Sequence, residues 1–172
     1  MDSSTSPDTA TQPVPREVRL DTVAAQTAAI DELIGLAQQN LQVFDIDLSQ
    51  TGWNTVARAA NLAAFLRRAP SAHFELIVHD TRWMEASCPR LLNLLKLYSS
   101  AMTVYKTGPE ARMAMDPLII VDGRHYLHRF HIDQPGAAFV IENPQQAMPL
   151  VTRFGEIWAT GEPGIAGTVL GL

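Results

Sequence analysis

The sequence has one cysteine and no long apolar run, and these absences exclude several classes of protein. Cys88 alone can form neither an intrachain disulfide nor a four-cysteine zinc site. No apolar stretch approaches the roughly 20 residues that a transmembrane helix needs. Residues 1–15 lack the basic and apolar segments of a signal peptide, so we expect a cytoplasmic protein with no membrane partner.

Positive charge is also scarce. The 172 residues carry a formal net charge of −5, whereas nucleic-acid-binding domains usually have a basic surplus, so we do not expect nucleic acid as a partner. A hydrophobic fraction of 47% fits a globular protein with a sizeable core. Residues 1–18 are rich in Ser, Thr, Pro and Asp and predict a disordered tail. We expect one domain over residues 19–160 and a loose, glycine-rich tail over residues 161–172.

Hydrophobic periodicity and turn signals predict alternating helices and strands. The expected helices cover residues 22–40, 54–68, 89–98 and 144–158, and the expected strands cover residues 41–46, 74–78, 102–106, 118–121, 126–132 and 137–141. Asp21 and Asn54 are the expected N-caps of the first two helices, and Pro149 predicts a kink or a later start in the last one. This order predicts an α/β fold, with a mixed sheet and helices on both faces.

The segment PLIIVDGRHYLHRFHID, residues 117–133, contains the clearest local signal. Asp122-Gly123 between two extended runs predicts a hairpin, because both central positions of a type I′ turn need positive φ. If residues 125–133 form one strand, one face carries His125, Leu127, Arg129, His131 and Asp133, while His128 faces the core. Arg129 beside His131 suits a phosphate or carboxylate ligand. The alternative is a structural ion pair of Arg129 with Asp133 or Asp122.

Polar residues also follow the expected strands, and in such sheets these residues collect in one crevice. Asp45 and Asp47 could hold a cation or cap a loop, and His79-Asp80 could bind a ligand or, through Asp80, cap the next helix. The candidate ligand-binding residues are His79, Asp80, Asp122, Arg129, His131 and Asp133. We assign no catalytic residue, no metal and no cofactor. Arg58, Arg67 and Arg68 predict a small solvated basic face on the second helix.

The order of elements resembles one half of the phospholipase D-like fold. Two segments carry this resemblance, the hairpin at Leu118-Ile-Ile-Val-Asp-Gly123 and the helical Phe154-Gly-Glu-Ile-Trp158. It covers roughly residues 25–160. The resemblance implies the shared fold, and it also implies a homodimer, because single-unit members of that family pair to complete their site.

The resemblance further implies that the catalytic residues are missing. The family's motif is His-x-Lys-x4-Asp, in which the histidine is the nucleophile and the lysine neutralises the phosphate. With Asp122 as the aspartate, the histidine position falls on Met115 and the lysine position on Pro117. The later Gly-Ser-x-Asn falls near Arg129-Phe-His-Ile132. Methionine and proline can supply neither function, so we expect no phosphodiester hydrolysis by that mechanism.

A second resemblance concerns partners. The segments His79-Asp80, Cys88-Pro-Arg-Leu91 and Arg129-Phe-His-Ile-Asp133 resemble an uncharacterised bacterial domain that is often fused to GNAT acetyltransferases. The chain lacks the Arg/Gln-x-x-Gly-x-Gly/Ala loop that would bind the pyrophosphate of coenzyme A. The resemblance therefore implies an acetyltransferase as a partner rather than as the activity of this chain.

Three functional hypotheses follow. The leading one is a non-catalytic phospholipase D-like domain that acts as a binding or regulatory module. The second is an enzyme or binding protein for a small anionic ligand, held by His79, Arg129, His131 and Asp133. The third is an accessory domain of an acetyltransferase. The second hypothesis requires the side chains of His79 and Arg129 to meet in one open pocket.

Overall fold

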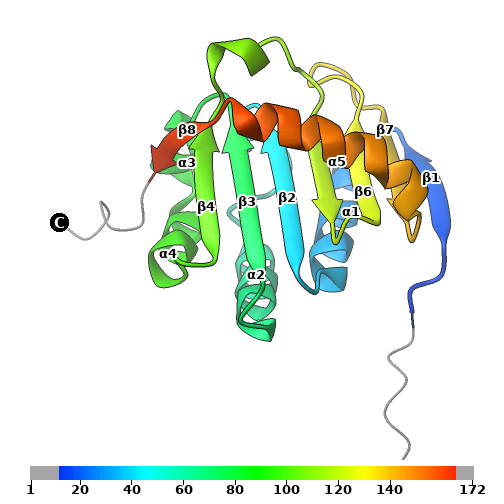
Figure 1. Ribbon diagram of the computed structural model, residues 1–172, viewed down its shortest axis with the longest axis horizontal. Helices are drawn as coiled ribbons and strands as arrows, with labels where there is room; N and C mark the ends of the chain where they lie inside the picture. Colours follow the sequence, from blue (N-terminus) through cyan, green and yellow to red (C-terminus); the bar gives the residue numbers. More distant parts are fainter. Residues whose placement is uncertain (1–11, 166–172) are drawn as a thin grey trace, which may run out of the picture.

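Eight strands form one mixed sheet in the computed structural model, which describes residues 12–165 (Figure 1). Their order is β1-β7-β6-β5-β2-β3-β4-β8. Strands β2, β3 and β4 run parallel, and all other neighbours pair antiparallel. The strands are β1 (Arg16–Leu20), β2 (Asn40–Asp45), β3 (His73–Val78), β4 (Met102–Lys106), β5 (Leu118–Val121), β6 (His125–Arg129), β7 (Ala137–Ile141) and β8 (Glu162–Ile165). The predicted α/β mixed sheet is confirmed.

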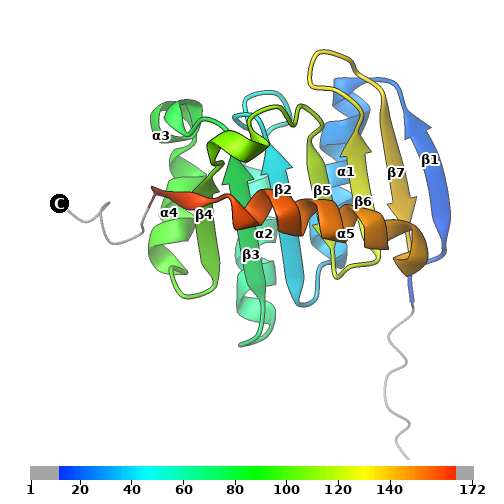
Figure 2. The same cartoon turned by 45° about the horizontal axis from the view of Figure 1, so that its top comes forward.

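Helices cover both faces of this sheet, as predicted (Figures 1 and 2). One face carries α1 (Val23–Leu36), α2 (Val56–Arg68), α3 (Arg82–Ser87) and α4 (Pro89–Leu97), and the other is crossed by α5 (Pro144–Ala159). Alternate strand residues serve the two cores: Val43 of β2 packs on the α1 side, whereas Phe44 packs with Phe154 of α5. Within residues 12–165, no helix is long and apolar enough to cross a bilayer.

The helix boundaries differ from the prediction by small amounts. Thr22 and Thr55, rather than Asp21 and Asn54, are the N-caps, and their hydroxyl oxygens accept from Ala25 N at 3.1 Å and Arg58 N at 3.2 Å. Each N-cap stands one residue after the predicted one. Asp, Asn and Thr all cap helices, so the sequence alone does not choose between two such residues in a row.

The last helix shows a larger difference from the prediction. Helix α5 runs without a break through Pro149, and it starts at Pro144 with Asn143 as its N-cap. Pro149 and Gln145 are both exposed, so the carbonyl that proline leaves without a donor can be hydrated by water. The expected later start, nearer Ala147, is therefore wrong.

Both predicted tails are partly wrong. Strand β1 pairs with β7, with Val18 opposite Phe139, so residues 16–18 belong to the sheet. Strand β8 pairs with β4, so residues 162–165 belong to it as well. Both are edge strands that carry charged residues or proline, a composition that hides them from a search for apolar runs. Residues 1–11 and 166–172 lie outside the described residues.

The predicted hairpin is confirmed, but its second strand is shorter than expected. Asp122 and Gly123 both have positive φ, of 53° and 66°. Strand β6 ends at Arg129, after which Phe130 N donates to Gly136 O at 3.1 Å and closes a loop. His131 and Asp133 are therefore loop residues, and the single strand over residues 125–133 is wrong.

Candidate functional site

Most of the candidate residues lie at the edge of the sheet where β2, β3 and β4 end, which we call the carboxyl edge. The register places Leu118 of β5 opposite Phe44 of β2 and opposite His128 of β6, so the start of β5 and the end of β6 reach the same edge. The candidates found there are His79, Asp80, Arg129, His131 and Asp133. Asp122 lies at the opposite edge, in the β5–β6 turn (Figure 1).

Both ring nitrogens of His79 are bonded to protein atoms. Nε2 lies 2.6 Å from the carbonyl oxygen of Ala114, and Nδ1 lies 2.6 Å from Oγ1 of Thr107. A carbonyl can only accept, so Nε2 carries a proton and donates to Ala114, while Nδ1 shares a hydrogen bond with the threonine hydroxyl. The ring also meets Phe44 edge to face, with 5.3 Å between centroids. These contacts fix the His79 ring between β3, β4 and the loop before β5.

Asp80 stands one residue before Thr81, the N-cap of α3, so the predicted cap position is wrong by one residue, but its side chain does bond the start of that helix. Its Oδ1 accepts from the backbone N of Arg82 at 2.9 Å, at the start of α3, and its Oδ2 pairs with the Arg82 guanidinium at 2.6 Å. The hydrogen bonds from Arg82 lower the pKa of Asp80 to about 2. The pair is solvent-exposed on the arginine side, so it adds little to stability.

Arg129 is buried, and protein oxygens accept from each of its three nitrogens. Nε donates to Gln134 O at 2.8 Å, NH2 to Ile132 O at 2.7 Å and NH1 to Oε1 of Gln50 at 2.6 Å. Burial lowers the pKa of Arg129, although the carboxylates of Asp45 and Asp133 act in the other direction. The guanidinium thus ties the loop after β6 to the loop after β2.

The candidates do not converge on one pocket. His79 packs on Phe44 on the α5 side of the sheet, whereas Arg129 lines a small cavity with Gln26 and Ile30 of α1 on the other side. His131 Nδ1 accepts from Asp133 N at 3.1 Å, and both side chains are exposed, 43% and 81%. The arrangement that the second hypothesis required, His79 and Arg129 in one open pocket, is therefore absent from the described structure.

Asp45 and Asp47 differ sharply in environment. Oδ1 of Asp47 accepts from the backbone N of Ser49 at 2.9 Å and from its hydroxyl at 2.7 Å, which is loop capping. Asp45 is buried beside Arg129, and its Oδ1 accepts from Ile46 N at 2.6 Å. Burial raises the pKa of Asp45 from 3.8 to about 6, and the Ile46 hydrogen bond offsets part of that effect.

We expect this buried carboxyl to make stability fall between pH 4 and pH 6. The folded state favours the protonated form of Asp45, so this carboxyl ionises in the unfolded chain first, as pH rises past 3.8. The resulting loss of folding stability is complete above the folded pKa of about 6. Asp45→Asn keeps the oxygen acceptor without the charge. It should remove this slope and raise the free energy of unfolding at pH 7.5 by about 2–3 kcal/mol in urea titrations. Asp47→Asn is the control, and an unchanged slope in Asp45→Asn would contradict the assignment.

A cluster that the sequence analysis missed joins β6, α5 and the loop before β5. Asp116 accepts from His128 Nε2 at 2.8 Å and from Arg153 Nε at 2.8 Å, with a second bond to Arg153 NH2. Burial alone would raise the pKa of Asp116, but these hydrogen bonds outweigh it and lower the pKa to about 2. The prediction that His128 is a hydrogen-bonded structural histidine agrees with these contacts.

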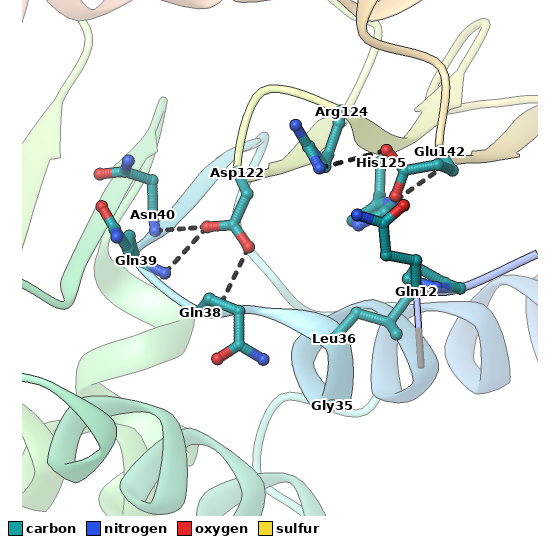
Figure 3. A pocket seen from close by; sticks show the side chains of 11 residues that line it. Gln12, Gly35, Leu36, Gln38, Gln39, Asn40, Asp122, Arg124, His125 and Glu142 are labelled. Carbon is teal, nitrogen blue, oxygen red and sulfur yellow. Dashed lines mark hydrogen bonds and ion pairs between the residues drawn. The ribbon is translucent and has the colours of Figure 1, made fainter. Parts of the chain in front are cut away.

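Asp122 acts as a structural acceptor in the α1–β2 connection. Its two carboxylate oxygens accept three backbone N–H groups, from Gln38, Gln39 and Asn40, all at 2.9 Å (Figure 3). These donors follow the end of α1 and start β2, so the hairpin tip fastens that connection to the sheet. The described contacts of Asp122 include no histidine–lysine pair.

Met115 and Pro117 stand at the carboxyl edge and contribute through their backbone. Met115 O accepts from Ile132 N at 2.7 Å, and Pro117 O accepts from Arg129 N at 2.9 Å. These bonds hold the loop after β6 against the start of β5. Neither side chain offers a nucleophile or a cation. Among the described residues, no three His, Cys, Asp or Glu side chains lie close enough together to hold a metal ion.

Arg58 is the clearest residue that the sequence analysis placed wrongly. It was assigned to a solvated basic face, but this residue of α2 is fully buried and its side chain contacts α1. Its Nε bonds Asp31 at 2.9 Å, NH2 donates to Thr27 O at 3.0 Å, and NH1 donates to Thr51 O. Its position one turn before Leu62 put it on the apolar stripe of the helix, so periodicity could have shown the burial.

Solved structures share this fold at low sequence identity. TrmBL2, an archaeal chromatin protein with a novel mode of DNA binding, superposes with a TM-score of 0.66 at 13% identity over 91% of this chain and 56% of that one. Nuc from Salmonella typhimurium, a phospholipase D family member, gives 0.65 at 12% over 89% of this chain and 100% of Nuc. Phosphatidylserine synthase of Haemophilus influenzae Rd KW20 gives 0.63 at 14% over 90% and 41%. The chain thus spans about half of TrmBL2 and less of the synthase.

These structures establish a phospholipase D-like fold, as the resemblance implied, and nothing about activity. None of the curated proteins compared with the chain matches it in sequence. A family model does match, over residues 22–166, and its description is a domain of unknown function (DUF7931). Because that match covers most of the chain, the protein belongs to the DUF7931 family.

Proposed function

We propose that this chain is a phospholipase D-like domain without phosphodiesterase chemistry, which acts as a binding or regulatory module. One observation carries the proposal. With Asp122 taken as the aspartate of the phospholipase D motif, Met115 and Pro117 occupy the positions of its nucleophilic histidine and its lysine. Asp122, the part of the motif that remains, is fully engaged with backbone donors of the α1–β2 connection. Its retention therefore has a structural reason that does not need catalysis.

The neighbouring polar residues offer no evident replacement. A nucleophilic histidine needs a free ring nitrogen, and both nitrogens of His79 are bonded to protein. Arg129 could neutralise a phosphate only by giving up its bonds to Gln134, Ile132 and Gln50. A small anionic ligand at these residues would have to displace protein acceptors, which weighs in favour of the non-catalytic module.

An assay with an activated diester tests the proposal. Purified protein with bis(p-nitrophenyl) phosphate should release no p-nitrophenol above the buffer rate, from pH 5 to pH 9. The control is His79→Gln, because the His79 ring bonds the carbonyl oxygen of Ala114, the residue before Met115. Wild-type hydrolysis that disappears in His79→Gln would contradict the proposal and support an enzyme with a different constellation.

Pairing of two copies and an acetyltransferase partner complete the proposal. Met113 and Phe130, on the loops at the carboxyl edge, expose 89% and 46% of their surface and offer apolar area for such contacts. Sedimentation equilibrium should give a dimer whose association weakens in Phe130→Glu, and a strict monomer at high concentration would contradict pairing.

Affinity purification from native lysate should retain an acetyltransferase, and its absence there would count against that partner.

A further inference from the structure

A cavity of about 500 Å³ opens at the edge of the sheet opposite the carboxyl edge. It lies between the end of α1, the start of β2 and the β5–β6 turn (Figure 3). Its volume falls within the range of about 300–1,000 Å³ typical of sites for small ligands. The residues that line it are Gln12, Pro13, Gly35, Leu36, Gln38, Gln39, Asn40, Asp122, Arg124, His125 and Glu142.

A buried histidine presents a fixed donor to this cavity. His125 is only 3% exposed, and its Nδ1 accepts from the backbone N of Glu142 at 2.9 Å. A backbone N–H can only donate, so the neutral ring carries its proton on Nε2. Within residues 12–165, no group accepts a hydrogen bond from Nε2. Every fully buried side-chain nitrogen in that range does have a partner, so Nε2 is not fully buried. Nε2 therefore reaches open space, and the space that His125 lines is this cavity.

The rest of the lining offers neutral hydrogen-bonding groups. The side-chain amides of Gln12, Gln38, Gln39 and Asn40 make no hydrogen bond with any described residue, so each keeps donors and an acceptor for a ligand. Leu36 and Pro13 supply apolar surface. Groups of both kinds on one wall suit a molecule that alternates hydroxyl and C–H surface.

The charges of the site disfavour an ionic ligand. The negative end of the α1 dipole and the Asp122 carboxylate oppose an anion. A cation in direct contact with either carboxylate would have to displace protein donors, because Asp122 accepts three N–H groups and Glu142 pairs with Arg124 at 3.2 Å. That pair also neutralises the arginine. Among the described residues, no Phe, Tyr or Trp ring lines the cavity, so a nucleobase would lack a large ring to stack on.

We propose that this cavity binds an uncharged, hydroxyl-rich ligand, a sugar of one or two rings, which accepts a hydrogen bond from His125 Nε2–H. The surrounding side-chain amides bind the remaining hydroxyl groups. The site is independent of the slot at Met115 and Pro117, which lies at the far end of β5, so the result of the diester assay does not affect it.

Gly35 provides a matched pair of variants for the test. It lies in α1 on the cavity wall, and an added Cβ would meet nothing within 4 Å. Gly35→Phe should fill the cavity without disturbing packing, whereas Gly35→Ala leaves it open and favours the helix. Circular dichroism should show both variants folded, so a loss of binding in Gly35→Phe alone reports the cavity.

The experiment is calorimetric titration with a panel of neutral mono- and disaccharides, alongside glucose 6-phosphate and glucosamine as charged counterparts. At least one neutral sugar should bind wild type and Gly35→Ala, weaken at least tenfold in Gly35→Phe, and shift the His125 Nε2–H resonance. The proposal is overturned if no neutral sugar binds up to about 10 mM, where affinity falls below about 3 kcal/mol. Equal binding by Gly35→Phe, or selective binding of the charged sugars, would overturn it as well.

Discussion

Arg58→Met is expected to lower the free energy of unfolding by about 3–4 kcal/mol, the largest effect of any change considered. Methionine keeps most of the side-chain volume, so the variant isolates the loss of the guanidinium. That group bonds Asp31 and the carbonyls of Thr27 and Thr51, and its carbon lies 4.8 Å from the centre of the Trp53 ring. Without it, two carbonyls beside the core lose their donor.

The measurement is urea unfolding at pH 7.5, with Arg67→Met as the matched control. Arg67 is an exposed residue of the same helix and bonds Tyr98 Oη at 3.2 Å, so its replacement should change stability by less than about 0.5 kcal/mol. Asp31 is 37% exposed and can be rehydrated, so Asp31→Asn should cost less than Arg58→Met. Equal, small losses in both arginine variants would show that Arg58 is not a structural centre.

Asp122→Asn is expected to lower the free energy of unfolding by about 2–3 kcal/mol. Three backbone N–H groups converge on one carboxylate, and a well-shielded hydrogen bond to a charged group contributes about 1.5–3 kcal/mol net. The donors belong to exposed residues, so water recovers part of the loss. Asparagine also adopts positive φ, so the turn itself, with φ of 53°, is retained.

Asp133→Asn is the control for this second prediction, because Asp133 is an 81% exposed loop residue with a weak contact to His131. Thermal and urea unfolding should leave it within about 0.5 kcal/mol of wild type. Hydrogen exchange adds a local measurement: the amides of Gln38, Gln39 and Asn40 should exchange faster in Asp122→Asn. Unchanged exchange at these amides would contradict the fastening role of Asp122.

Most of the inner strands and helices were predictable, because their signals are local. Asp122-Gly123 specifies a turn from two residues, and Pro89 marks the first residue of α4, as predicted. The candidate site was less predictable. Whether Arg129 is free or satisfied depends on the carbonyls of Ile132 and Gln134, and those positions follow from loop conformation rather than from residue type. The open wall beside His125 likewise depends on how α1 ends.

Strands β1 and β8 lie at the two ends of the sheet order, and this has a practical consequence for labelling. Eight strands at about 4.8 Å spacing place the two outermost strands roughly 34 Å apart. Fluorophores attached at residue 14, just before β1, and at residue 165, in β8, would therefore lie on opposite sides of the sheet. A change in energy transfer between the two labels would report the detachment of either edge strand before the central strands unfold.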